Sequence, residues 1–121
     1  MKILLAEDDV LTRKSLTYFL EARNYEVIHA TDGEAALEQL NHKEFDLIIT
    51  DLNMPKVGGM ELIHIIRKEM QLHTPVIVLT ASGVEQTELD AFAIGASEFI
   101  TKPFSPSVLD TRIKRLVPQS R

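Results

Sequence analysis

The chain has 121 residues and carries 13 basic and 18 acidic side chains, which give a formal net charge of −5. This length fits a single domain with a packed core, and the acidic balance argues against direct nucleic-acid binding, which uses clustered lysine and arginine. Because the chain has no cysteine, disulfides, cysteine-ligated zinc and thiol nucleophiles are excluded.

The chain opens with the apolar run Ile3-Leu4-Leu5-Ala6, which three acidic residues follow. An export signal needs about 7–15 consecutive apolar residues, so this run is too short to direct export or to cross a membrane. We therefore expect no contact with a membrane and a cytoplasmic location.

Short apolar runs with β-branched members recur along the chain and predict the buried strands of a parallel sheet. They cover residues 3–6, 27–30, 47–50, 76–80 and 99–101. We expect the sheet layer to be filled by Ile3, Ile28, Ile48, Ile49, Val76, Ile77, Val78 and Leu79.

Stretches of helical length with one apolar face separate these runs. The faces expected to be buried contain Leu16, Phe19 and Leu20; Ala36, Leu37 and Leu40; Leu62, Ile63, Ile66 and Met70; Leu89, Phe92 and Ala93; and Leu109, Ile113, Leu116 and Val117. The segment Thr31-Asp32-Gly33-Glu34 fits a capping box at a helix start, and Ser105 places a capping hydroxyl before a proline, Pro106, at the first position of another helix. The alternation predicts a (βα)5 α/β fold with an open, doubly wound parallel sheet, because five strands are too few for an eight-stranded barrel.

Polar side chains follow four of the predicted strands, at the point where each strand ends. They are Glu7, Asp8 and Asp9 after the first strand, Asp51 after the third, Thr80 at the end of the fourth and Lys102 after the fifth. Ligands of open α/β sheets bind beyond the carboxyl ends of the strands, so we expect these groups to converge. One lysine cannot neutralise Glu7, Asp8 and Asp51 together, and oxygen ligands without histidine or cysteine select a hard cation. Mg²⁺ is therefore the expected ion.

The Asp51 carboxylate is also a candidate nucleophile, because a carboxylate can accept a phosphoryl group as an aspartyl phosphate. Asp51 ends the predicted central strand, which leaves Glu7 and Asp8 to hold the metal. Lys102, the Thr80 hydroxyl and backbone N–H groups can bind the phosphoryl oxygens during transfer.

Four motifs stand in order at these strand ends. They are Ile3-Leu4-Leu5-Ala6-Glu7-Asp8-Asp9, Asp51-Leu52-Asn53-Met54-Pro55 with Gly58-Gly59 after it, Thr80-Ala81, and Thr101-Lys102-Pro103-Phe104. With this combination the chain resembles the receiver domain of two-component response regulators, the CheY-like fold. The resemblance implies a flavodoxin-like sheet with strand order 2-1-3-4-5, a receiver domain over residues 1–117 and a C-terminal tail over residues 118–121.

The resemblance implies a phosphorylation-switched signalling domain that assists its own phosphorylation and dephosphorylation but is not an enzyme in its own right. Asp51 is then the phosphoacceptor, which receives a phosphoryl group from a sensor histidine kinase or a phosphotransfer protein. Asp8, Asp51 and the Asn53 carbonyl are the implied Mg²⁺ ligands, with Glu7 acting through water. The phosphorylated domain controls a downstream effector domain or protein.

The resemblance also implies how the signal leaves the site. Lys102 contacts the phosphoryl group and precedes a cis Lys102-Pro103 bond, the Thr80 hydroxyl moves toward the phosphoryl group, and Phe99 holds the aromatic switch position. The face made by the fourth helix, fifth strand and fifth helix then changes conformation.

Many transcription-factor receivers form homodimers through that face with alternating charges. Arg112 and Glu98 are compatible with such a homodimer, whereas Glu88 stands where those receivers often carry arginine.

Several assignments have an alternative in the sequence, since Asp51 taken alone can be a turn residue before Pro55 and Lys102 a surface lysine. A shift of one residue would make Asp8 and Asp9 the acidic pair, whereas the favoured pair, Glu7 and Asp8, leaves Asp9 to cap the first helix. Thr80 can instead bond backbone at a strand end, and Phe99 can be an ordinary core residue.

Two other functions use related chemistry. A Mg²⁺-dependent phosphatase of the haloacid-dehalogenase type would need a second acid as proton donor two residues after its nucleophile. This chain has Asn53 there, which cannot transfer a proton. A flavodoxin-type flavin binder would need a hydroxyl- and glycine-rich phosphate loop after the first strand, where Glu7-Asp8-Asp9 would repel the ligand. Both departures favour the receiver interpretation.

Overall fold

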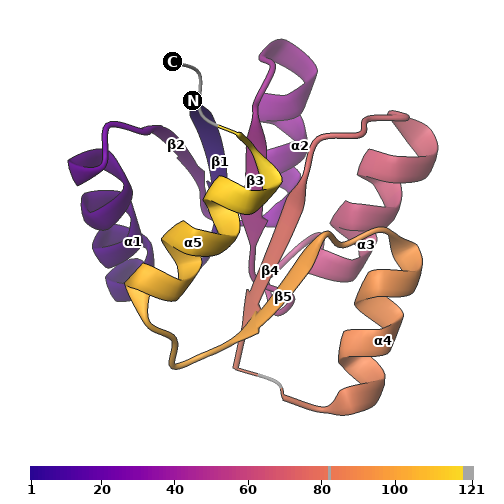
Figure 1. The fold of residues 1–121 in the computed structure, drawn as a ribbon. Coiled ribbons are helices and arrows are strands. Elements are labelled where there is room, and N and C mark those ends of the chain that lie inside the picture. Colours follow the sequence, from indigo (N-terminus) through magenta and orange to yellow (C-terminus); the bar gives the residue numbers. More distant parts are fainter. Residues whose placement is uncertain (82, 119–121) are drawn as a thin grey trace.

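The computed structural model describes residues 1–81 and 83–118. Its strands and helices alternate along the whole chain (Figure 1). In chain order they are β1 (Lys2–Ala6), α1 (Val10–Ala22), β2 (Glu26–Ala30), α2 (Gly33–His42), β3 (Leu47–Thr50), α3 (Gly59–His64) continued by the π-helical segment η1 (Ile65–Glu69), β4 (Val76–Thr80), α4 (Glu85–Ile94), β5 (Glu98–Thr101) and α5 (Pro106–Leu116). The predicted C-terminal tail begins at Pro118, and its residues 119–121 lie outside the described part of the chain.

The strands form one parallel sheet in the order β2-β1-β3-β4-β5, which confirms the predicted doubly wound topology. In the central pair, Ile3 lies opposite Leu47 and Ala6 opposite Thr50. Because all strands run in the same direction, their carboxyl ends share the edge that is lowest in Figure 1. Residues that directly follow the strands are thereby brought to one edge.

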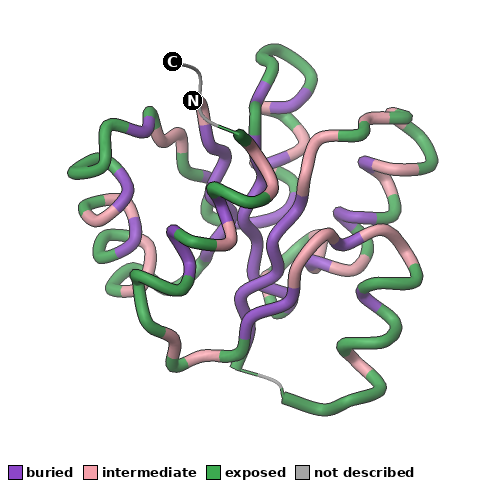
Figure 2. The backbone as a smooth tube through the Cα atoms, viewed as in Figure 1, coloured by how far each residue is buried: buried purple, intermediate pink, exposed green. Residues whose placement is uncertain are grey.

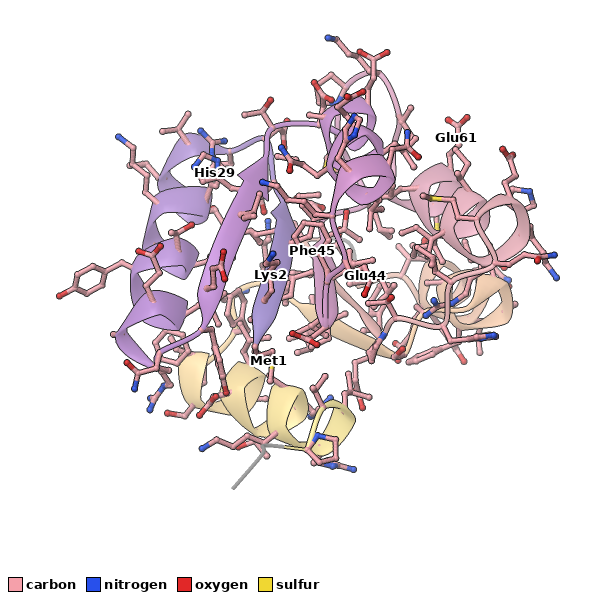
Figure 3. The ribbon with its side chains drawn as sticks, turned by 90° about the horizontal axis from the view of Figure 1, so that it is seen from above. Met1, Lys2, His29, Glu44, Phe45 and Glu61 are labelled. Carbon is pink, nitrogen blue, oxygen red and sulfur yellow. The ribbon has the colours of Figure 1, made fainter. Side chains whose placement is uncertain are left out.

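Helices cover both faces of the sheet, which Figure 3 shows along the strands from their amino ends. The core between the sheet and helices α1 and α5 includes Leu5, Leu20 and Leu109. The core between the sheet and helices α2, α3 and α4 includes Leu4 and Ile63. The predicted sheet core is buried except at one position. Ile28 is only half-buried because β2 is an edge strand, which has a neighbouring strand on one side only.

Aspartate side chains begin the first two helices. The Asp9 carboxylate accepts hydrogen bonds from the Thr12 N–H at 2.9 Å and the Thr12 hydroxyl at 2.7 Å, so it caps α1 as expected. At α2 the cap is Asp32, which accepts from the Ala35 N–H at 2.7 Å. The predicted capping box was therefore wrong by one residue, since Asp32 rather than Thr31 takes the capping position.

The third crossover departs from a regular α-helix. The stretch expected to form one helix with Leu62 and Ile66 on its face is α-helical only to His64, and the turn that follows is π-helical. From this turn the Arg67 guanidinium donates to the carbonyl oxygens of Gly95 at 3.0 Å, Leu72 at 2.9 Å and Thr74 at 2.8 Å. Arg67 thus ties η1 to the carboxyl end of α4.

The fourth helix packs on a different face from the one predicted. Leu89 is 54% exposed and Phe92 42% exposed, and Ala93 is exposed as well, whereas Ala91 is buried. Figure 2 shows α4 as largely exposed. Apolar side chains occur around most of this helix, so their spacing did not identify the side that faces the sheet.

A buried hydrogen bond joins the α1–β2 turn to α5. The Tyr25 hydroxyl donates to Asp110 Oδ1 at 2.9 Å, and both residues are 6% exposed. Lys114 Nζ lies 3.2 Å and Arg23 Nε 3.7 Å from Asp110 Oδ2, so the buried carboxylate is compensated. Burial, with the hydrogen bond and charge of Asp110, raises the pKa of Tyr25 to about 12.

This pair predicts a pH-dependent loss of stability. The unfolded chain loses the Tyr25 proton near pH 10 and the folded protein only near pH 12, so the contribution of Tyr25 is complete below pH 10 and falls as the pH rises to 12. We expect Tyr25→Phe to unfold with a shallower dependence on pH between 10 and 12, as measured by urea denaturation. Tyr18→Phe, at an exposed tyrosine, is the matched control. Equal slopes for Tyr25→Phe and the wild type would contradict the assignment.

The described residues contain no helix that is long and apolar enough to span a bilayer.

Candidate functional site

The acidic loop after β1 places three carboxylates in different surroundings. Glu7 is 1% exposed, its N–H donates to the Ala30 carbonyl at 3.0 Å, and its Oε2 accepts from the Asp9 N–H at 3.2 Å. Asp8 is exposed. Because Asp9 caps α1, its side chain is directed to the helix rather than to the sheet edge.

The Asp51 carboxylate lies directly beyond β3, the central strand. It is 9% exposed, and its Oδ1 accepts from the N–H groups of Leu52 at 2.6 Å and Asn53 at 3.2 Å. The buried Thr50 hydroxyl donates to the Asp51 carbonyl oxygen at 2.8 Å. These contacts hold both the backbone and one carboxylate oxygen of Asp51 in place.

Lys102 connects the first and third strand ends. Its Nζ lies 2.8 Å from Glu7 Oε1 and 3.0 Å from Asp51 Oδ2. Its backbone N–H donates to the Thr80 carbonyl at 2.8 Å, and the Lys102-Pro103 bond is cis. Lys102 follows β5, an outermost strand of the sheet, and its side chain therefore reaches the site at the end of the central strand β3.

The electrostatics of the cluster follow from burial. Desolvation raises the pKa of Glu7, and the hydrogen bonds from Lys102 and the Asp9 N–H only partly offset this effect. Desolvation alone would lower the pKa of Lys102, but the hydrogen bonds to Glu7 and Asp51 outweigh it, so the pKa of Lys102 is raised. The lysine therefore stays charged between the two carboxylates.

The three carboxylates of Glu7, Asp8 and Asp51 each place an oxygen within 4.8 Å of the others. When all three acids are ionised, their three negative charges and the one positive charge of Lys102 give the cluster a net charge of −2. Oxygen ligands with this charge match a hard divalent cation such as Mg²⁺. The residues present therefore fit such an ion.

The other predicted site residues lie around this cluster. Thr80 is fully buried at the end of β4, and Asn53 is exposed in the loop after Asp51. Phe99 is 8% exposed and packs in the core beneath α2, α3 and α4. Of the two acidic pairs that the sequence allowed, the structure brings Glu7 and Asp8, not Asp9, together with Asp51.

Two contacting residues were missed by the sequence analysis. Arg13 donates to the Glu7 carbonyl, and Thr50 donates to the Asp51 carbonyl. The signal for Arg13 was its place in the first turn of a predicted helix, because helical side chains point toward the helix amino end. The contact of Thr50 depends on the local path of the backbone, which the residue pattern did not indicate.

Known response regulators resemble this chain over most of its length. A model of the response regulator receiver domain matches residues 3–114. The transcriptional regulatory protein CrdR of Helicobacter pylori is 40% identical over 114 residues, which are 94% of this chain and 54% of CrdR. The phosphate regulon transcriptional regulatory protein PhoB of Escherichia coli is 37% identical over 117 residues, which are 96% of this chain and 51% of PhoB. The chain thus spans about half the length of these relatives.

Solved structures show the same fold over nearly the full length. The chemotaxis response regulator CheY4 of Vibrio cholerae superposes with a TM-score of 0.88 at 32% identity and covers 96% of this chain and 98% of its own. The receiver domain of the Francisella response regulator 1452 gives a TM-score of 0.89 at 30% identity, with 95% and 94% covered. On the family match, these identities and the shared fold, the chain belongs to the receiver domain family of two-component response regulators, in which phosphorylation and Mg²⁺ binding are general properties.

Proposed function

We propose that this chain is a phosphoacceptor switch that takes a phosphoryl group onto Asp51 from a phosphohistidine of a sensor histidine kinase or a phosphotransfer protein. The observation that supports it best is the position of the Asp51 carboxylate. It is 3.0 Å from the Lys102 ammonium and lies with Glu7 and Asp8 in one acidic cluster. The proposal places this exchange in the cytoplasm.

In the proposed step, an Asp51 carboxylate oxygen attacks phosphorus while the bond from phosphorus to the histidine nitrogen breaks. The imidazole keeps the electron pair of that bond and is protonated from solvent. The N–H groups of Leu52 and Asn53 fix the nucleophile, and Lys102 is placed to bind a phosphoryl oxygen. Mg²⁺, when bound, supplies charge neutralisation for the phosphoryl oxygens.

The proposed metal ligands are Asp8, Asp51 and the Asn53 carbonyl, with Glu7 acting through water. Glu7 is the most buried acid of the cluster, which supports an indirect role. Asp8 is exposed, so a hydrated ion can reach it from solvent. The same groups would assist hydrolysis of the aspartyl phosphate.

The proposed output is a change of the face formed by α4, β5 and α5, with Thr80 and Phe99 as the residues that respond to the phosphoryl group. A phosphoryl group on Asp51 adds negative charge that competes with Glu7 for the Lys102 ammonium. The backbone N–H of Lys102 also donates to the Thr80 carbonyl, so a shift of Lys102 can reach Thr80. The exposed Leu89 and Phe92 on α4 supply apolar surface for a downstream effector domain or protein.

A homodimer through the same face is a further proposal. Arg112 lies 2.7 Å from Glu98 within one chain, and in the proposed homodimer this pair would be exchanged for pairs between the two copies. Glu88, exposed on α4, is the departure from the usual charge pattern.

The test of the function is covalent labelling by a small phosphodonor such as acetyl phosphate, followed by the mass of the intact protein. We expect one added phosphoryl group in the presence of Mg²⁺ and none when a chelator removes the metal. Asp51→Ala removes the acceptor and should abolish labelling. Asp9→Ala is the matched control, because Asp9 belongs to the same loop but caps α1, and it should keep labelling.

The variants separate the alternatives. Labelling that persists in Asp51→Ala would identify another acceptor and reject the proposal. Labelling lost in Asp9→Ala, with the variant still folded, would instead place Asp8 and Asp9 at the metal.

A further inference from the structure

The Arg13 side chain extends from α1 back over the acidic loop. Arg13 is the fourth residue of α1, and side chains of a helix point toward its amino end. One guanidinium nitrogen donates to the Glu7 carbonyl at 3.0 Å and lies 3.5 Å from the Asp8 carbonyl, a longer and weaker contact. The same guanidinium therefore contacts both residues that carry the proposed metal-binding acids.

Other contacts hold the two ends of this loop. The Glu7 N–H donates to the Ala30 carbonyl, and the Asp9 carboxylate caps the helix through Thr12. The Asp9 N–H also donates to Glu7 Oε2 at 3.2 Å, but none of these contacts engages the carbonyl oxygens of Glu7 and Asp8. Within the described residues, the Arg13 guanidinium is the side-chain donor that does so.

We propose that Arg13 is a positioning residue for the divalent cation site, a role that rests on the proposed function. By holding the carbonyls of Glu7 and Asp8, it orients these two residues so that their carboxylates face Asp51 in one cluster. It acts through the backbone and does not itself touch the metal or the phosphoryl group.

A purely electrostatic role for Arg13 would have the opposite sign. A positive charge beside an acidic cluster repels a cation, so its removal alone would strengthen cation binding. Loss of positioning would weaken binding, because the carboxylates would no longer be held in a common arrangement. The neutral variant Arg13→Gln therefore distinguishes the two roles by the direction of the change.

The experiment is calorimetric titration with Mg²⁺ of the wild type, Arg13→Gln, Arg13→Lys and Lys14→Gln. Mutation of residues that hold metal ligands in place typically lowers metal affinity by roughly 10–100-fold. We expect a loss of about 10-fold for Arg13→Gln, because Arg13 holds carbonyl groups rather than the carboxylates themselves. Arg13→Lys keeps the charge and an ammonium donor group but loses the planar fork of the guanidinium, so it should recover part of the loss. Lys14→Gln removes the same charge at the next, exposed residue of α1 and should not weaken binding.

A second readout separates positioning from general destabilisation. In phosphodonor labelling, Arg13→Gln should need more Mg²⁺ to reach half of its maximal rate, while the rate at saturating Mg²⁺ stays near that of the wild type. A variant that is only less stable would lower the urea midpoint without moving the Mg²⁺ midpoint. If Arg13→Gln does not fold, weaker Mg²⁺ binding by Arg13→Lys than by the wild type supports the proposal, and equal binding overturns it.

The failures of the two proposals are distinguishable. Unchanged or tighter Mg²⁺ binding by Arg13→Gln, with normal binding by the wild type, overturns the role of Arg13 and leaves the proposed function intact. If the wild type itself bound no divalent cation, the proposed function and the role of Arg13 would fail together.

Discussion

Lys102→Met is expected to lower the free energy of unfolding by about 2–4 kcal/mol at neutral pH without metal, because removing one partner of a fully buried ion pair costs about 3–5 kcal/mol and this pair is partly open to solvent. The side chain of Lys102 is 20% exposed, and its partners Glu7 and Asp51 are 2% and 11% exposed. Methionine fills similar space but leaves the two carboxylates facing each other. Urea denaturation of the metal-free protein measures the loss.

The deficit of Lys102→Met should depend on pH and on Mg²⁺. Because burial already raises the pKa of Glu7, the folded state holds this proton more tightly than the unfolded chain does. Lowering the pH through the folded pKa therefore stabilises the folded protein relative to the unfolded chain, and the deficit should shrink. Added Mg²⁺ should stabilise the variant more than the wild type, because the lysine no longer competes for the carboxylates.

The matched control for this prediction is Lys56→Met. Lys56 is 60% exposed and lies 3.5 Å from Glu34 and 3.9 Å from Asp32, so it forms ion pairs near the surface. Such pairs contribute about 0–1 kcal/mol. If Lys102→Met were as stable as Lys56→Met in the absence of metal, the lysine would not be compensating the buried carboxylates.

Gly59→Ala is expected to destabilise the protein by about 3 kcal/mol and to impair labelling of Asp51, since over-packing costs typically 1–3 kcal/mol and more where backbone must move. Gly59 is buried at the start of α3. An added Cβ would overlap the Asp51 carbonyl oxygen and lie 2.7 Å from Leu52 Cα. Both atoms belong to the backbone, so the strain would fall on the segment that carries the phosphoacceptor.

Gly83→Ala is the control for Gly59→Ala. Its added Cβ would lie 3.6 Å from Thr101 Cγ2, an ordinary contact at an exposed residue. We expect a change below about 1 kcal/mol, because alanine also restricts the unfolded chain. Urea midpoints of the two variants test the difference. Equal midpoints would show that the close approach of Gly59 to the Asp51 backbone does not exclude a side chain at this position.

The parts of the fold that could be predicted from the sequence are those that depend on which residues are apolar. The runs over residues 47–50 and 76–80 have the bounds of β3 and β4, and the other strands differ by one residue at their amino ends. The placement of Glu7, Asp8, Asp51 and Lys102 followed because parallel strands bring the residues after them to one edge.

The parts that could not be predicted depend on contacts between elements that are distant in the sequence. Ile28 looked like core because its run is mostly apolar, and the residue pattern alone does not reveal that β2 is an edge strand, which only the strand order implied by the resemblance indicates. The buried side of α4 is set by Ala91, a small residue, while the larger Leu89 and Phe92 face solvent. Arg67 reaches three carbonyls that no periodic pattern indicates.

The contact of Arg67 with Gly95 makes the two ends of α4 unequal. The carboxyl end is tethered to η1, whereas Val84, which precedes the amino end, is 58% exposed. A helix of ten residues is about 15 Å long, so a tilt of about 10° around the tethered end would displace the amino end by about 3 Å. If α4 moves in the proposed response, we therefore expect the displacement to be smallest at Gly95 and largest at the amino end, which follows Thr80 in the chain.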